Sequence, residues 1–271
     1  MRRTICLHAK SSYHFAMSTT SMAPVASDRL SLDAPWRWLG AGWRDLLAAP
    51  VLSIGYGLFV VGGGLLIVVG LWRAGLSALI PVAFGAFALL GPLLAVGLYE
   101  MSRRLQAGEG PRLFPVKFAG PRSPLQIAFI GFFLLFATMV WVLVAMALYA
   151  LFSAGSYVPL SEFLTFAITE PQGLAMIVIG SIFGVAIAFA IYLLTVVSIP
   201  MLMNERTDAF TAIAAGVDAF RKSPGVMLLW AWLIAVLVAG GVATLFAGLA
   251  IVFPLVGHAT WHAYRDISAQ R

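Results

Sequence analysis

Long stretches without a charged residue alternate with short polar segments along the whole chain. Asp, Glu, Lys and Arg are absent from positions 46–72, 74–99, 123–161, 171–204 and 223–264. Each stretch exceeds the roughly 20 apolar residues that are needed to cross a hydrocarbon layer about 30 Å thick. Each stretch therefore predicts at least one membrane-spanning helix.

The last stretch is too long for one crossing. At about 1.5 Å per residue, a single helix over positions 223–264 would measure roughly 63 Å, about twice the thickness of the layer. A reversal is expected near Gly240-Gly241 or Gly248, because glycine permits the backbone conformations of tight turns. The pattern thus predicts six spans, at Val51–Trp72, Leu76–Leu98, Leu125–Phe152, Leu174–Pro200, Val226–Ala243 and Leu245–Tyr264. The alternative is five spans, with a single crossing in the last stretch, which would move only Arg265 and Arg271 to the opposite side.

These spans are expected to be helices, since in lipid each backbone polar group must be paired within its own segment and the alternation of barrel strands is absent. The expected fold is all-α, a polytopic membrane helical bundle in which about six transmembrane helices form three hairpins. Residues 31–271 are expected to form a single integral-membrane domain. Residues 1–30 lack the apolar core of a signal peptide and are expected to be a disordered cytoplasmic tail, with Met17 and Met22 as alternative starts of translation.

Two amphipathic segments share a pattern that is typical of helices lying at a membrane surface. One precedes the first span and ends at Pro50, and the other precedes the fifth span and ends at Pro224. Measured back from these prolines, four apolar positions and an Ala-Gly pair coincide; they are Trp36, Leu39, Trp43 and Leu46 with Ala41-Gly42, and Phe210, Ile213, Val217 and Phe220 with Ala215-Gly216. We interpret the chain as three hairpin units, each introduced by a proline at Pro50, Pro124 or Pro224.

Composition and charge place this bundle in a membrane and orient it. With 61% hydrophobic and 10% charged residues, the chain has too little polar surface for an ordinary water-exposed globule. In the six-span threading, Arg73 is the only one of the 17 Lys and Arg residues that lies on the side opposite both termini. Lys and Arg resist translocation, so both termini are expected in the cytoplasm. The same placement, with anionic lipid, accounts for the net charge of +6, and no nucleic-acid partner is expected.

The sharpest candidate site is the pair His258 and His262. At i and i+4 on a helix, two imidazoles face the same way and could hold a metal ion or an anionic headgroup. Aligning the prolines of the even-numbered spans places Asn204, with Glu205 next to it, opposite His258, and Glu100 opposite His262. The alternative is that all five are polar caps where helices leave the bilayer. Two ligands without a third nearby favour this structural role, so no metal and no other cofactor is expected.

Aromatic and basic residues near the span ends are expected to anchor the helices at the membrane surface. They are Trp36, Trp43, Tyr99, Arg103, Trp261, Tyr264 and Arg265.

Catalytic chemistry has little support in the sequence. The span cores contain no ionisable acid or base, and nucleophile-elbow, metalloprotease and phosphate-loop motifs are absent, so we expect neither an enzyme nor an ion-coupled pump. We expect a non-enzymatic scaffold or accessory subunit that contacts lipid and another membrane complex or its own copies. The alternative is a permease or channel for a small neutral or lipid-like substrate. Discontinuous helices or a polar cavity at mid-membrane depth would favour this alternative.

Several motifs resemble one known family. The C-terminal run Gly257-His258-Ala259-Thr260-Trp261-His262-Ala263-Tyr264-Arg265-Asp266 resembles the bacterial integral-membrane family called domain of unknown function 2189. Trp36-Arg37-Trp38-Leu39 and Gly91-Pro92-Leu93-Leu94 are similar to the same family, and the resemblance extends over about positions 33 to 268. It implies a multi-pass protein of a bacterial inner membrane, without an established activity, substrate or cofactor.

Overall fold

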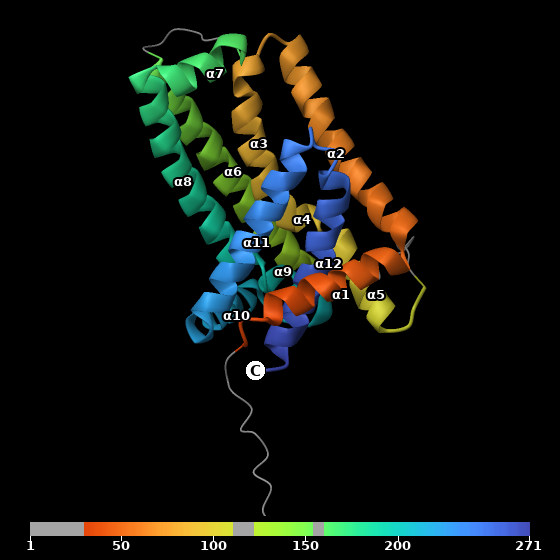
Figure 1. The fold of residues 1–271 in the computed structure, drawn as a ribbon. Helices are drawn as coiled ribbons and strands as arrows, with labels where there is room; N and C mark the ends of the chain where they lie inside the picture. Colours follow the sequence, from red (N-terminus) through yellow and green to blue (C-terminus); the bar gives the residue numbers. More distant parts are fainter. Residues whose placement is uncertain (1–29, 111–121, 154–159) are drawn as a thin grey trace, which may run out of the picture.

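The computed structural model describes residues 30–110, 122–153 and 160–271. Every regular element in these ranges is a helix, which confirms the all-α class (Figure 1). The tail expected over residues 1–30 lies outside the described residues, apart from Leu30. The long helices run side by side, and shorter helices lie across their two ends.

Four helices among the described residues are long and apolar enough to cross a membrane. They are α2 (Pro50–Arg73), α6 (Pro124–Phe152), α8 (Pro171–Thr195) with its continuation α9 (Ser198–Asn204), and α11 (Pro224–Ala243). All four coincide with predicted spans. Each begins at a proline. The N–H groups of the first helical turn have no acceptor within the helix, so proline, which has no N–H, loses no hydrogen bond there.

The second predicted span is divided into short pieces. The chain forms a 3₁₀ turn η1 (Ser77–Leu79), α3 (Ile80–Leu89), α4 (Gly91–Leu94) and α5 (Val96–Gln106). Pro92 cannot donate to the carbonyl four residues earlier, and α3 ends within one turn before it. A similar interruption separates α8 from α9 at Val196 and Val197, where Val196 lies four residues before Pro200. Proline thus accounts for both interruptions, whereas Pro254 lies inside the continuous helix that ends the chain.

The long C-terminal stretch reverses direction between α11 and α12 (Leu249–Ser268). However, α12, which covers most of the sixth predicted span, is not among the four candidate spans. In the turn between α11 and α12, Leu245 and Phe246 have left-handed backbone conformations, with φ of 54° and 69°. The sequence had instead favoured glycine at the reversal. The Thr244 hydroxyl donates to the Gly241 carbonyl and accepts from the Gly248 N–H, both at 2.8 Å. A Cβ at Gly248 would lie 3.0 Å from the Gly241 Cα. Gly241 and Gly248 therefore allow the two sides of the turn to pack closely, and they do not provide the left-handed backbone of the reversal itself.

Replacing Leu245 with glycine is expected to stabilise the protein by about 1 kcal/mol, because left-handed backbone is strained for leucine and free for glycine. Little packing is lost, since Leu245 is 86% exposed. The matched control is Leu66→Gly, which removes a similarly exposed leucine from the interior of α2 and should destabilise by about 1 kcal/mol. Thermal unfolding in detergent compares the two variants, and a lower midpoint for Leu245→Gly would contradict the strain.

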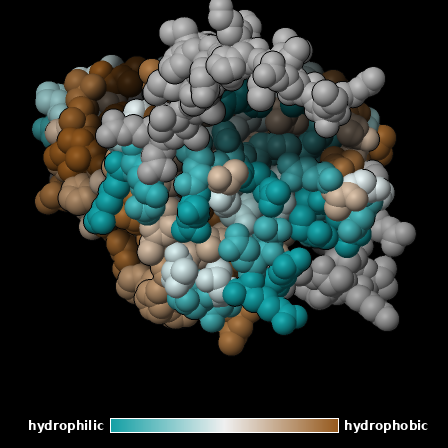
Figure 2. All heavy atoms as spheres, turned by 90° about the horizontal axis from the view of Figure 1, so that it is seen from below, coloured by the Kyte–Doolittle hydropathy of each residue, from teal (hydrophilic) through white to brown (hydrophobic). Residues whose placement is uncertain are grey.

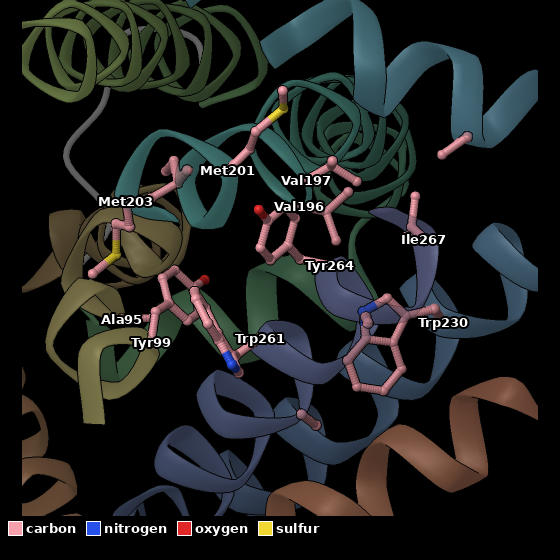
Figure 3. Packing of buried hydrophobic residues seen from close by; sticks show 14 of the residues in the cluster. Ala95, Tyr99, Val196, Val197, Met201, Met203, Trp230, Trp261, Tyr264 and Ile267 are labelled. Carbon is pink, nitrogen blue, oxygen red and sulfur yellow. The ribbon is translucent and has the colours of Figure 1, made fainter. Parts of the chain in front are cut away.

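Neighbouring helices form a closed ring. α2 packs against α3 and α12, and α6 packs against α3 and α8. α11 packs against α12, and the Tyr192 hydroxyl of α8 donates to the Met227 carbonyl of α11 at 2.8 Å. At the end where the C-terminus lies, α5, α9 and α12 contact one another, and their buried side chains belong to one hydrophobic cluster, the central cluster. Figure 3 shows this cluster, where Trp261 and Tyr264 of α12 lie among Tyr99 of α5 and Val196, Val197 and Met201.

Glycine allows α12 to lie very close to two other helices. A Cβ at Gly57 of α2 would lie 2.1 Å from the Ala250 carbonyl oxygen. A Cβ at Gly42 of α1 (Ala34–Ala48) would lie 2.6 Å from the Ala259 backbone nitrogen. Real side chains do not tolerate such distances to backbone atoms, so both crossings depend on glycine.

The two amphipathic segments fold as α1 and α10 (Ala209–Lys222), across the end that carries the C-terminus. A third short helix, α7 (Leu160–Thr169), lies across the opposite end. The correspondence between α1 and α10 extends to burial, because Ala41-Gly42 and Ala215-Gly216 are both buried. The residue before each unit's proline also has similar backbone angles, at Ala49 (−139°, 58°), Ser123 (−133°, 64°) and Ser223 (−137°, 61°).

Candidate functional site

His258 lies at a crossing of three helices and has no exposed surface. Its Nε2 lies 3.0 Å from the Ser53 Oγ of α2, and its Nδ1 lies 2.7 Å from the Ser102 Oγ of α5. Both ring nitrogens therefore have hydroxyl partners, which can donate or accept for either tautomer. Because the ring is enclosed, no substrate or solvent reaches it in this conformation.

His262, one turn further along α12, contacts different partners. Its Nε2 lies 2.8 Å from the Asp45 Oδ2 of α1, and its Nδ1 lies 3.2 Å from the Gln106 Nε2 of α5. The Gln106 Oε1 in turn accepts from the Trp261 indole N–H at 3.0 Å. We call the whole set the histidine network; its members are Asp45, Ser53, Ser102, Gln106, His258, Trp261 and His262. It joins α1, α2, α5 and α12.

Burial and hydrogen bonding set the charges of His258 and Asp45, which both lie outside the four candidate spans. Burial lowers the pKa of His258, and the attraction of the Asp45 carboxylate offsets this only in part. Burial also raises the pKa of Asp45, but hydrogen bonds with His262 and Ser102 outweigh it and hold that pKa below its usual value. At neutral pH the network therefore contains a neutral His258 and an ionised Asp45.

The remaining predicted site residues lie apart from the histidines. Glu100 accepts hydrogen bonds from the Arg103 and Arg104 Nε atoms, at 2.8 and 2.7 Å, within α5. Burial raises the pKa of Glu100, but the two guanidiniums outweigh it and keep that pKa below its usual value. Asn204 and Glu205 meet at Tyr264, whose hydroxyl accepts from Asn204 at 3.0 Å and donates to Glu205 at 2.7 Å.

The five candidate residues thus form separate groups. The structure brings Asn204 and Glu205 together, but places neither of them, nor Glu100, against a histidine. Among the described residues, no group of three or more His, Cys, Asp and Glu side chains is arranged to hold a metal ion. The geometry is that of structural hydrogen bonding between helices.

The predicted surface anchors divide into two kinds. Trp36 and Trp43 are 57% and 45% exposed on α1, where they can meet lipid, and Arg265 is also exposed. Arg103 is partly exposed and paired with Glu100. In contrast, the side chains of Tyr99, Trp261 and Tyr264 are buried in the central cluster.

Sequence reasoning missed four members of the network, namely Asp45, Ser53, Ser102 and Gln106. One signal was available for Asp45, which follows Trp38 and Ala41 at helical spacing and so lies on the face of α1 opposite the exposed tryptophans. An acid on a buried helix face requires a partner. No comparable pattern marks the two serines, because their partners come from distant parts of the chain.

The family comparison agrees with this architecture. Residues 79–204 match a family model described as "predicted integral membrane protein (DUF2189)". The match covers a little less than half of the chain. The DUF2189 match confirms the family expected from the sequence, and it extends from the start of α3 to the end of α9. The C-terminal run that contributed to that expectation, with both histidines of the network, lies beyond the DUF2189 range. No curated protein and no solved structure matches the chain.

Proposed function

We propose that this protein is a non-enzymatic scaffold or accessory subunit of a bacterial inner membrane. One observation carries the proposal: polar side chains within the apolar segments are bound to backbone carbonyls. The Tyr56 hydroxyl donates to the Leu94 carbonyl at 2.6 Å, and the Trp141 indole donates to the Val82 carbonyl at 2.9 Å. Thr138 donates to the Leu134 carbonyl within its own helix at 2.8 Å. The Tyr56 and Trp141 groups thus join neighbouring helices, the Thr138 hydroxyl is paired within its own helix, and polar groups paired in this way do not offer themselves to a solute.

The proposed topology has both chain ends in the cytoplasm. In Figure 1, α2, α6 and α11 lead away from the end with the C-terminus, and α3–α5, α8–α9 and α12 return to it. Apart from Arg73 at the far end of α2, the Lys and Arg residues of the described ranges belong to the near end. Figure 2 views this end and shows hydrophilic side chains gathered on it, with hydrophobic ones around them. The charge bias favours this end as cytoplasmic, with the membrane boundary at the level of α1.

The alternative is a permease or channel for a small neutral or lipid-like substrate. The interruptions at Leu90 and at Val196-Val197 favour it, because discontinuous helices are common at transporter binding sites. However, two recesses among the described residues lie at the polar end, one on α1 and one between α10 and the end of α12. Neither lies at mid-membrane depth, and we therefore prefer the scaffold.

Mild detergent extraction of the tagged chain, followed by mass spectrometry of intact assemblies, tests the proposal. We expect a stoichiometric complex with another membrane protein or with further copies of the chain, absent from a parallel purification of an unrelated tagged membrane protein. A monomer without partners that releases small neutral tracers from proteoliposomes would instead support the permease. A reporter fused after Arg271 that is active only in the periplasm would overturn the topology.

A further inference from the structure

The outer surface of α1 has an apolar edge and a polar edge beside the buried face. The apolar edge consists of Trp36, Trp43 and Leu47, which are 57%, 45% and 57% exposed, and it is continued by Leu32 just before the helix, which is 68% exposed. The polar edge consists of Asp33, Arg37 and Arg44, all exposed. A helix with this arrangement lies in the membrane surface, with the apolar edge toward the acyl chains and the polar edge toward water.

A shallow recess lies where these two edges meet. It is lined by Asp33, Trp36, Arg37, Gly40 and Arg44. Gly40 stands one turn from both Trp36 and Arg44, and its missing side chain leaves the space between them open. A Cβ at Gly40 would have no atom within 4 Å, so helix packing does not require glycine here. An exposed glycine inside a helix costs about 1 kcal/mol relative to alanine, and the fold gives no reason for it.

One guanidinium at this recess has no partner among the residues that the structure describes. Arg37 is paired with Asp33 and with Asp266. Arg44 forms no hydrogen bond or ion pair with any residue in the described ranges. A free guanidinium suits a phosphate group, which it can bind with two parallel hydrogen bonds. The neighbouring indole of Trp36 is of the kind found at headgroup level.

The α10 helix provides a comparison within the same molecule. Phe210, Ala214 and Asp218 occupy the positions that correspond to Trp36, Gly40 and Arg44. The corresponding positions are exposed in both helices, but α10 has a methyl group in place of the open space and an acid in place of the free arginine. Asp218 is paired with Lys222 at 3.2 Å. The recess is therefore a feature of α1 and not of amphipathic helices in this fold generally.

We propose that the α1 recess binds the headgroup of an anionic phospholipid from the leaflet that contacts α1. Arg44 binds the phosphate, Gly40 provides the space, and Trp36 lies along the glycerol region of the lipid. The inference rests on the proposed placement of α1 at the membrane surface, and it is independent of the scaffold role.

The test uses the full chain purified in detergent and exposed to equal amounts of phosphatidylglycerol and phosphatidylcholine, with bound lipids counted by mass spectrometry of the intact protein. The wild type is expected to retain phosphatidylglycerol preferentially. Arg44→Gln should reduce the preference about fivefold, as expected for one basic side chain at a lipid surface. Gly40→Leu should reduce it by a similar factor, because leucine fills the recess without meeting another residue.

The matched control is Arg221→Gln, which removes an exposed arginine from α10 and should leave the preference unchanged. If Arg221→Gln and Arg44→Gln lose the same share of the phosphatidylglycerol preference, the preference comes from general surface charge and the site is overturned. A wild type that shows no preference would also overturn it. Displacement of the lipid by millimolar inorganic phosphate would assign the recess to a soluble ligand and also overturn the proposal. Thermal midpoints establish that each variant is folded. If the reporter fused after Arg271 is active only in the periplasm but the lipid preference is retained, the proposed orientation is wrong and the lipid site still stands.

Discussion

Alanine in place of Gly57 is expected to lower the free energy of unfolding by about 3 kcal/mol, at the upper end of the usual cost of overpacking. The added methyl carbon would lie 2.1 Å from the Ala250 carbonyl oxygen and 2.8 Å from its carbon. Both are backbone atoms, which cannot rotate away as a side chain can. α2 and α12 must therefore separate, and Ser53, one turn before Gly57, would move away from His258.

Gly55→Ala is the matched control, two residues away on the same helix. A Cβ at Gly55 would have no atom within 4 Å, so this substitution should be neutral or stabilise α2 by up to about 1 kcal/mol. Unfolding of both variants by titration with sodium dodecyl sulfate in mixed micelles provides the comparison. Equal stability of the two variants would contradict the close crossing of α2 and α12.

Acidification from pH 7 to pH 5 is expected to destabilise the protein by up to about 2 kcal/mol through His258 alone. Burial lowers the pKa of His258 in the folded state, so the unfolded chain, with an ordinary value of about 6.5, takes up the proton first as the pH falls. The stability that depends on the neutral imidazole is therefore complete above about pH 6.5 and declines below it. Asp45 does not interfere, because a carboxyl with a lowered pKa loses its contribution only below about pH 4.

His258→Gln separates this titration from the packing of the ring. The amide can still bond to Ser53 or Ser102 but has no proton to gain in this range. We expect the variant to be about 1–3 kcal/mol less stable than the wild type at pH 8 and much less sensitive to pH between 7 and 5. Unfolding titrations at pH 8, 7, 6 and 5 measure both effects. A pH dependence in His258→Gln as steep as that of the wild type would rule out His258 as its source.

The apolar helices were predictable because their signal lies within each segment. The predicted span Val51–Trp72 differs from α2 by one residue at each end, and Val226–Ala243 differs from α11 only at its start. The interruption of α8 and α9 also follows from a local cause, the missing N–H of Pro200. Composition and local backbone chemistry are enough for such elements.

The central cluster and the histidine network were not predictable, because both depend on where distant helices meet. Trp261 and Tyr264 have the composition of surface anchors, yet their surroundings come from α5 and α9 and enclose them. His258 and His262 are adjacent on one helix, but their partners are separated from them by more than 150 positions in the sequence. The i, i+4 spacing showed a shared helix face and could not show that the face was already occupied.

The network also has a consequence for the order of events during synthesis. Asp45 on α1 and Ser53 on α2 leave the ribosome roughly 200 residues before His258 and His262. Until α12 arrives, the acid on the inner face of α1 has no histidine, and Gly42 and Gly57 have no helix against them. The contacts of α1 and α2 with α12 are therefore among the last to form, and in a nascent protein stalled before α12 the Asp45 carboxylate lacks its histidine partner.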